Sequence, residues 1–177
     1  NKIHGSNKNI KKNILKEIII LAIEISREGR EGRKIGTLFI IGDEKEVIKR
    51  SQTLIFDPLI GHPTEIKRIT NRNFRETIKE LAQLDGAFIV SDDGIFLSAT
   101  RYISTECKTS DVPLGLGSRH IAAASITKST SSVAIVVSES SVVRIFINGK
   151  MISEILPELW LIQRARKLHK DRKIKKC

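Results

Sequence analysis

The chain has 177 residues, of which 40% are hydrophobic and 5% aromatic, and its formal net charge is +11. This length and the aliphatic content favour one folded domain over disorder, while two cysteines, Cys107 and Cys177, form no disulfide framework and no apolar run is long enough to span a membrane. The charge admits nucleic acid, acidic membranes or phosphorylated small molecules as partners, but it is concentrated in residues 1–16 and in the tail from Arg164 to Lys176.

The first third of the chain is predicted to form a helix, a strand and a short helix. A recurring apolar stripe indicates an amphipathic helix that ends before Gly29: Ile10, Ile14, Ile18, Leu21 and Ile25. A glycine-rich, charged loop follows. Thr37–Ile41 then has the continuous apolar character of a buried strand, and Glu44–Ser51 is typical of a short helix.

The middle of the chain predicts a second amphipathic helix and a β-hairpin. The helix covers Asn73–Leu84, with an apolar stripe of Phe74, Ile78, Leu81 and Leu84. The hairpin joins Ala87–Val90 to Ile95–Ala99 through a turn at residues 91–94. A polar loop is expected from Tyr102 to Gly117.

The last third predicts a helix from Ser118 to about Lys128, strands at Val133–Val137 and Val142–Ile147, a turn at residues 148–149, and a final helix that begins near Pro157. Helices placed before, between and after apolar strands indicate an α/β fold. We expect a central mixed, mostly buried β-sheet flanked by helices on both faces. The whole chain, 1–177, is predicted to be one domain, with a core at about 10–155 and a basic C-terminal helix or tail at about 156–177.

One segment that could carry chemistry lies between the second helix and the hairpin. Asp85 can hold a hard cation such as Mg²⁺ or Mn²⁺, and Gly86 lets a ligand approach the backbone. Taken alone, an Asp-Gly pair is more often a turn between two elements. The pair therefore needs a second motif before it indicates a site.

A second segment, Leu116–His120, lies at the start of a predicted helix. Unpaired backbone N–H groups and the helix dipole favour a phosphate there, and Ser118, Arg119 and His120 add donors. An equally good interpretation makes Ser118 an N-cap and leaves the two basic side chains in solvent. Ser138 and Glu139 follow a buried strand, where Glu139 is either a metal ligand or part of a surface turn.

Together these segments resemble the diadenylate cyclase family, whose signatures are a DGA motif and, some thirty residues later, a GTRHR motif. Here they read Asp85-Gly86-Ala87 and Gly117-Ser118-Arg119-His120-Ile121. The similarity covers roughly residues 10–155, including GTLFIIGD from Gly36 and VAIVVSES from Val133, and it is greatest to the archaeal branch.

The resemblance implies an enzyme that condenses two ATP molecules into cyclic di-AMP and two pyrophosphates, with Mn²⁺ or Mg²⁺ as cofactor. It implies Asp85, Arg119 and His120 as catalytic residues, and Asp85 and Glu139 as metal ligands. The implied nucleotide-binding residues are Gly86, Ala87, Ile103, Leu116, Gly117, Ser118, Arg119, His120 and Ser138, of which Ile103 would pack on adenine. One domain of this family holds one ATP, so activity would require a homodimer or higher homo-oligomer with facing sites. The expected compartment is the cytoplasm.

Two positions depart from the family motif. Ser118 replaces Thr and keeps the hydroxyl, whereas Ile121 replaces an Arg and removes a cation, for which Lys128 or Arg144 are candidate replacements. This loss motivates an alternative function, a catalytically weak or inactive ATP- or cyclic di-AMP-binding regulatory module. A third hypothesis, nucleic-acid binding, rests on the basic tail and is disfavoured because a basic helix end is more often solvated.

Overall fold

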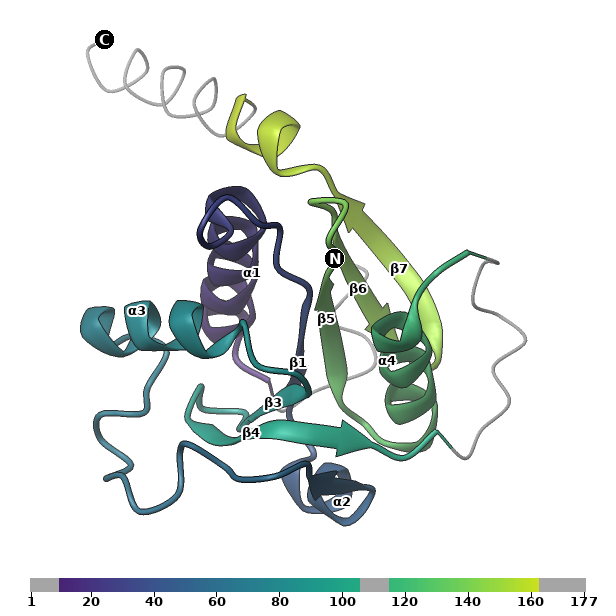
Figure 1. Cartoon of the computed structure of the whole chain (residues 1–177). Helices are drawn as coiled ribbons and strands as arrows, with labels where there is room; N and C mark the ends of the chain where they lie inside the picture. The colour runs from purple at the N-terminus through teal and green to yellow at the C-terminus, as the bar shows by residue number, and fades with distance from the viewer. Residues whose placement is uncertain (1–9, 106–114, 163–177) are drawn as a thin grey trace, which may run out of the picture.

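The computed structural model describes residues 10–105 and 115–162; the basic tail, the first nine residues and Cys107 lie outside this part of the chain. Its centre is a seven-stranded sheet in the order β2-β4-β3-β1-β5-β6-β7 (Figure 1). The strands are β1 (Thr37–Ile41), β2 (Ser51–Thr53), β3 (Ala87–Val90), β4 (Phe96–Ile103), β5 (Val133–Val137), β6 (Val143–Ile147) and β7 (Lys150–Ile155). Only β1 and β3 pair in parallel within this sheet; the other neighbours are antiparallel.

Helices cover both faces of the sheet. Helices α1 (Lys12–Glu28) and α3 (Arg72–Leu81) lie over one face, and α4 (Ser118–Ser129) and the short α2 (Glu44–Lys49) lie over the other (Figure 1). All five residues of the first predicted stripe are buried, although Ile10 lies just before the start of α1. The α/β class and the mixed, doubly covered sheet predicted from the sequence are therefore confirmed.

The central strand β1 shows why such strands are continuously apolar. Successive side chains of a strand point to opposite faces. Phe39 and Ile41 accordingly belong to the apolar cluster beneath α1 and α3, while Leu38 and Ile40 belong to the cluster beneath α4. Because both faces are covered by helices, alternation between apolar and polar residues is absent from β1, whose five residues are all buried.

Three sequence predictions were wrong at the edges of this core. Strands β2 and β7 were not predicted, since both are edge strands with polar or alternating sequences and little buried surface. Strand β4 continues to Ile103, so Tyr102 belongs to a strand and not to the predicted loop. Leu84 lies beyond the end of α3 and is exposed. The final helix begins at Pro157, as predicted, and is described as far as Ile162.

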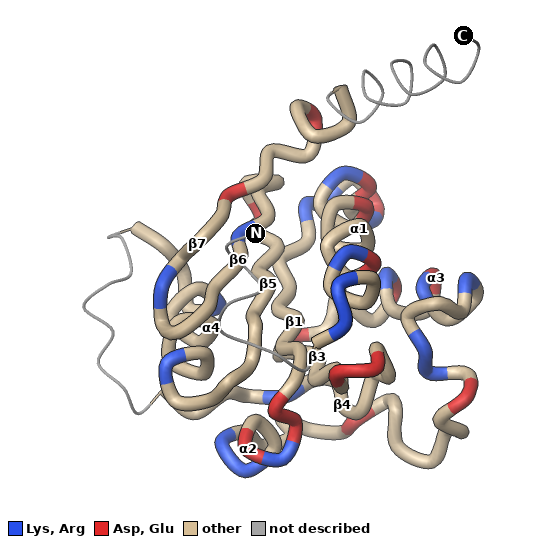
Figure 2. The backbone as a smooth tube through the Cα atoms, turned by 180° about the vertical axis from the view of Figure 1, so that it is seen from behind, with Lys and Arg blue, Asp and Glu red and all other residues tan. Residues whose placement is uncertain are grey.

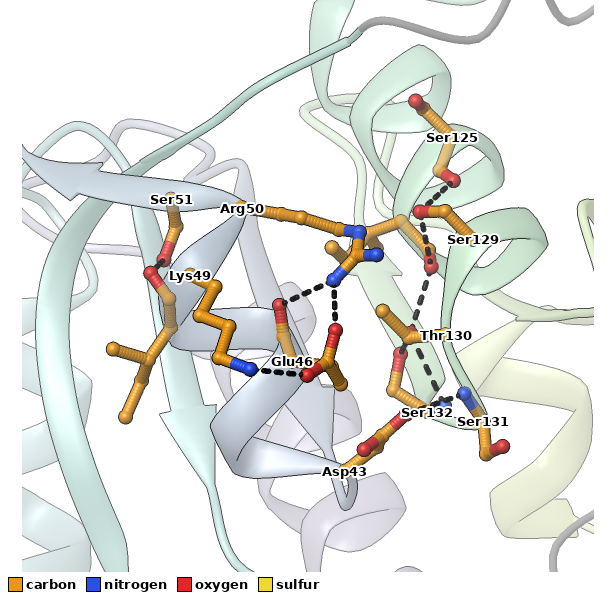
Figure 3. A network of polar contacts seen from close by, with 12 residues as sticks. Asp43, Glu46, Lys49, Arg50, Ser51, Ser125, Ser129, Thr130, Ser131 and Ser132 are labelled. Carbon is orange, nitrogen blue, oxygen red and sulfur yellow. Dashed lines mark hydrogen bonds and ion pairs between the residues drawn. The ribbon is translucent and has the colours of Figure 1, made fainter.

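Polar contacts join α2 to the far end of α4 (Figure 3). The Asp43 carboxylate, just before α2, accepts a hydrogen bond of 2.8 Å from the backbone N–H of Ser131. Within α2, Glu46 accepts from Lys49 at 2.7 Å and also pairs with Arg50. These contacts fix α2 beside the sheet, which matters because the carboxyl end of α2 contributes to the candidate site.

Lys, Arg, Asp and Glu lie side by side on the helices, and the inner strands carry few charges (Figure 2). A representative group joins α1 to α3, where the buried Lys79 pairs with Glu24, Glu28 and Glu76 within 3.5 Å. Positive charge in the described residues is therefore interspersed with negative charge. Among those same residues, no helix has both the length and the apolarity needed to cross a bilayer.

Candidate functional site

Two hollows flank the first turn of α4. The larger, a cavity of about 260 Å³, is lined by Leu38, Leu54, Asp85, Gly86, Ala87, Arg101, Tyr102, Ile103, Thr105, Ser118, Arg119, Ile121 and Ala122. The smaller, of about 190 Å³, is lined by Gly117, Ser118, Arg119, His120, Val136, Val137, Ser138 and Glu139. Ser118 and Arg119 line both, so the two hollows are neighbours on either side of one helical turn. The sequence motifs around Asp85 and Gly117 thus meet in space.

The sheet topology determines which strand ends meet here. The parallel strands β1 and β3 contribute residues near their amino ends, Leu38 and Ala87, which pair with each other. Strand β5 runs antiparallel to β1, so its carboxyl end lies beside Thr37 and delivers Ser138 and Glu139 to the same edge. Strand β4 runs antiparallel to β3 and brings its last residues, Arg101 to Ile103, to the same edge. The usual rule that ligands bind at the carboxyl ends of strands therefore holds here for β4 and β5, but not for β1 and β3.

Arg119 lies between the two carboxylates that the sequence singled out. Its guanidinium is 3.5 Å from Asp85 Oδ1 and 3.4 Å from Glu139 Oε1. The Asp85 and Glu139 side chains are 83% and 69% exposed, so both remain open to a ligand. The Nε atom of Arg119 is buried and has no hydrogen-bond partner among residues 10–105 and 115–162. A donor left unsatisfied beside a hollow favours an added acceptor such as a phosphate oxygen.

Gly36 makes room for this arginine, a role that sequence reasoning missed. A Cβ atom at Gly36 would lie 2.8 Å from Nη1 of Arg119 and 3.3 Å from Cγ of Glu139. Any larger residue would push the guanidinium away from one of its carboxylates. The signal in the sequence was a glycine directly before a buried strand, which often marks a close approach.

The first turn of α4 favours an anion. The N-cap is Gly117, which has no side chain to cap the helix, and the first turn contains no acidic residue. The alternative prediction that Ser118 is the N-cap is wrong, because Ser118 is the first helical residue and is exposed. Unpaired N–H groups and the positive end of the helix dipole therefore point toward the hollows.

His120 faces inward and is 5% exposed. Its ring packs edge-on against Phe146, with centroids 6.2 Å apart, and its Nε2 lies 3.2 Å from Nη1 of Arg144. Since arginine can only donate, Nε2 accepts and the imidazole is neutral. Burial, followed by the positive charge of Arg144, lowers the pKa of His120, although the backbone at Gly117 acts in the opposite direction.

The floor of the larger hollow is apolar. Ala87 and Ile103 are almost fully buried, and Leu38 lies beside them. Ile103 is thus available for the packing against a planar base that the resemblance implied. The rim carries Tyr102, whose half-exposed ring the sequence analysis had assigned to a loop.

Arg101 is a further lining residue that the sequence analysis missed. Its guanidinium donates to the Ser51 carbonyl at 2.7 Å, to Thr53 Oγ1 at 2.9 Å and to the Ile48 carbonyl at the end of α2 at 3.2 Å. These bonds hold β2 and α2 against β4. The Arg101 guanidinium therefore helps to build the wall of the cavity. In the sequence, only the alternation of residues 101–103, which is typical of a strand, could have indicated that Arg101 lies at the site.

Not every predicted residue joins the two hollows. Leu116 precedes α4 and is half-buried, but it lines neither of them. Lys128, one candidate replacement for the cation lost at Ile121, lies at the opposite end of α4 beside Gly149, so that suggestion is wrong. Arg144, the other candidate, is engaged by Glu154 at 2.7 Å and by His120. Ile121 itself lines the larger hollow and is 40% exposed.

Comparisons with known proteins identify the family to which this chain belongs. The family model DAC, described as DisA bacterial checkpoint controller nucleotide-binding, matches residues 24–151. A diadenylate cyclase of Methanocaldococcus jannaschii is 47% identical over 147 residues, which cover 82% of this chain and 46% of that protein. A diadenylate cyclase of Haloferax volcanii is 40% identical over 154 residues, covering 83% and 54%. The chain thus spans about half the length of these curated relatives.

Solved structures share the fold at low sequence identity. DacA from Staphylococcus aureus, crystallised as a double mutant, has a TM-score of 0.57 and 18% identity, covering 88% of this chain and 95% of that one. A hypothetical membrane spanning protein from Bacillus cereus has a TM-score of 0.57 and 22% identity, covering 78% and 63%. The family match spans most of the chain and includes both motifs that meet at α4, and on that ground the chain belongs to the DAC family of nucleotide-binding domains.

Proposed function

We propose that this protein is a diadenylate cyclase, which joins two ATP molecules into cyclic di-AMP and releases two pyrophosphates. The observation that carries the proposal is Arg119, which lies between two exposed carboxylates at the amino end of a helix and beside an apolar cavity. The two curated relatives carry the same activity in their names. Since ATP is the proposed substrate, we expect the protein to act in the cytoplasm.

The two hollows suit the two halves of a nucleotide. The apolar floor at Ala87 and Ile103 would accept the adenine ring. The first turn of α4, with Ser118 and Arg119, would bind the triphosphate through backbone N–H groups, a hydroxyl and a guanidinium. His120 contacts Arg144 in this structure and would act by fixing that helical turn and its hydrogen-bond donors.

A divalent metal fits these residues only in part. Among residues 10–105 and 115–162, no group of three or more His, Cys, Asp and Glu side chains could hold an ion. Mg²⁺ commonly binds through one or two carboxylates together with substrate phosphates, and Asp85 and Glu139 are two such carboxylates at one site. We expect Mn²⁺ or Mg²⁺ to arrive with the nucleotide and to neutralise charge that develops on the phosphates.

The reaction requires two nucleotides to face each other. The 3′-hydroxyl oxygen of each ATP attacks the α-phosphorus of the other, the bond from that phosphorus to the bridging oxygen breaks, and pyrophosphate leaves with its electron pair. The hydroxyl proton passes to a nearby base or water. Positioning and charge neutralisation supply most of the rate in such transfers. Each site described here would hold one nucleotide, so the proposal includes a homodimer with two-fold symmetry.

Asp85 is the residue on which to test the proposal. The Asp85→Asn variant should lose cyclic di-AMP formation from ATP with Mn²⁺ or Mg²⁺, measured by mass spectrometry, while its unfolding curve stays close to that of the wild type. Asp93→Asn is the matched control, because Asp93 is an exposed carboxylate that pairs with Lys11 away from the hollows. Unchanged turnover in Asp85→Asn would remove this residue from the mechanism.

A second candidate function is a regulatory module that binds ATP or cyclic di-AMP without turnover. The observation that favours it is Ile121, an aliphatic side chain on the wall of the larger hollow where the family motif has a cation. Tight ATP binding by calorimetry without product, across several divalent metals, would support the module. Nucleic-acid binding has less support, since positive and negative charges are mixed along the described helices (Figure 2).

A further inference from the structure

Strand β6 contains one charged residue, Arg144, within the otherwise apolar sequence VRIFI. Its side chain is 13% exposed and lies on the face of the sheet that α4 covers, because the alternate residue Phe146 belongs to the apolar cluster beneath that helix. A cation in such a place loses hydration, and an apolar residue of similar volume would usually be at least as stable. The position of Arg144 therefore calls for a role other than stability.

Arg144 joins the edge strand β7 to α4. Its Nε donates to Glu154 at 2.7 Å, and Glu154 is its direct neighbour across the ladder between β6 and β7. Its Nη1 donates to Nε2 of His120 at 3.2 Å. Because the ion pair with Glu154 restricts the guanidinium, Nη1 is held in place for the imidazole. The three side chains form a polar chain from the edge of the sheet to the first turn of α4.

The first turn of α4 lacks the usual side-chain cap of a helix. Its N-cap, Gly117, has no side chain that could accept from the first backbone N–H groups. The turn is closed by the N–H groups of His120 and Ile121, which donate to the Gly117 carbonyl at 3.0 and 3.4 Å. His120 is the buried side chain of this turn, and the adjacent Arg119 reaches the carboxylates of the candidate site. The contacts of His120 thus determine how firmly the turn is held.

We propose that Arg144, oriented by Glu154, is a positioning residue, which acts through His120 to hold the first turn of α4 in the geometry that the nucleotide needs. The inference rests on the proposed cyclase function, in which this turn binds the triphosphate. Arg144 lines neither hollow, so it does not replace the cation lost at Ile121 by contacting phosphate. It compensates for that loss by fixing the donors that remain, namely the N–H groups of the turn and the Arg119 guanidinium.

The first test measures how firmly the turn is held. Arg144→Met removes the donors and keeps an unbranched side chain, and Lys150→Met is the matched control, because Lys150 is an exposed cation on β7 away from both hollows. Hydrogen exchange of the full chain, followed by NMR, should show protection of the His120 and Ile121 amide protons falling at least about fivefold in Arg144→Met. The amide protons of the central strand β1 should keep their protection, and Lys150→Met should match the wild type throughout. Unchanged protection of the two amides, or an equal loss in β1, overturns the inference.

A second variant keeps the test decisive if Arg144→Met fails to fold. Glu154→Ala retains the arginine and removes the carboxylate that orients it. Because the Glu154 side chain is 45% exposed on an edge strand, its loss should leave the fold intact. The same two amide protons should lose protection, by less than in Arg144→Met, and wild-type protection in Glu154→Ala would show that β7 does not orient the arginine and would overturn the inference.

The second test asks whether this positioning matters for the proposed reaction. At saturating ATP, and at a protein concentration where activity per subunit no longer rises, cyclic di-AMP formation should fall at least about tenfold in Arg144→Met and about threefold in Glu154→Ala, because in-line attack depends on precise geometry. Calorimetric affinity for a non-hydrolysable ATP analogue should stay within about threefold of the wild type, since several donors share the binding. The double variant should be no slower than Arg144→Met alone, because Glu154 acts through Arg144.

The outcomes separate this inference from the cyclase function. If the wild type makes no product, the cyclase proposal fails, and hydrogen exchange alone decides whether Arg144 positions the turn. If the wild type is active, wild-type turnover in Arg144→Met overturns the inference. Additive losses in the double variant also overturn it, because Glu154 would then act independently of Arg144.

Discussion

Gly86 and Thr100 are in close backbone contact. A Cβ atom at Gly86 would lie 2.6 Å from the carbonyl carbon of Thr100, and the two residues have φ values of +103° and +51°. A β-branched residue with positive φ is a rare conformation that its surroundings must enforce. The positive φ of Thr100 coincides with the irregular pairing between β3 and β4. The Thr100 hydroxyl also donates a hydrogen bond to the Phe56 carbonyl. The glycine of the DGA motif is therefore required by the fold before any ligand binds.

The Gly86→Ala substitution should destabilise the protein by roughly 3 kcal/mol, since backbone strain and steric overlap each cost about 1–3 kcal/mol. Gly61→Ala is the matched control, because Gly61 also has a positive φ of 80° but has open space around it. It should cost only about 1 kcal/mol from strain. Urea unfolding of both variants makes the comparison, and equal losses would show that the contact with Thr100 is readily relieved.

Arg119→Lys should weaken catalysis while leaving the fold intact. Lysine keeps the charge but cannot span Asp85 and Glu139 with a planar fork. Loss of one charge-assisted hydrogen bond, worth about 1.5–3 kcal/mol, corresponds to a fall of about 10- to 100-fold in kcat/KM. Partly exposed ion pairs contribute less than about 1 kcal/mol, so the unfolding midpoint should barely move. Wild-type kinetics in this variant would exclude the guanidinium geometry as a catalytic requirement.

His120 should make folding stability depend on pH. Its pKa in the folded protein is lowered, chiefly by burial and then by Arg144, so the unfolded chain binds a proton more readily. The stability it contributes is complete above the unfolded pKa and is lost as pH falls through that value toward the folded one. We expect the free energy of unfolding to drop less between about pH 7.5 and about pH 5.5 in His120→Gln than in the wild type. His62→Gln, at an exposed histidine, should keep the wild-type difference, and an unaltered drop in His120→Gln would refute the assignment.

The buried parts of this protein were predictable from the sequence. Thr37–Ile41 is continuously apolar because helices cover both faces of the sheet. The apolar stripe of α1 repeats at helical spacing because one side of this helix packs on the sheet. The edge strands β2 and β7 were missed because they are paired on one side and carry polar residues. Leu84 was assigned to the apolar stripe because the pattern cannot show that α3 ends at Leu81.

The candidate site was predictable only where motifs are local. Asp85 and Arg119 each belong to a short motif, and the fold brings them within 3.5 Å. Gly36 and Arg101 were missed because their roles depend on neighbours distant in sequence. Gly36 lies against the guanidinium of Arg119 in α4, and Arg101 donates to the end of α2 and to β2. The inward orientation of His120 likewise depends on Phe146 and Arg144 in β6. Such contacts follow from strand order, which the sequence alone did not predict.

Restoring the missing cation is the last prediction. Ile121 is partly exposed and lines the larger hollow together with Ser118 and Arg119, the two residues proposed to bind the triphosphate. Ile121→Arg should therefore fold normally and add a guanidinium close to the proposed triphosphate position. One partly solvated ion pair is worth about 1 kcal/mol, which corresponds to roughly a fivefold gain in ATP affinity by calorimetry, decreasing as salt is raised. Ile152→Arg on β7 is the control for an added positive charge away from the hollow. An equal gain in ATP affinity in that variant would show that the added charge attracts ATP nonspecifically. If cyclic di-AMP forms only after Ile121→Arg, the natural chain is the regulatory module; if the wild type also forms it, Ile121 is compatible with catalysis and the lost cation affects rate alone.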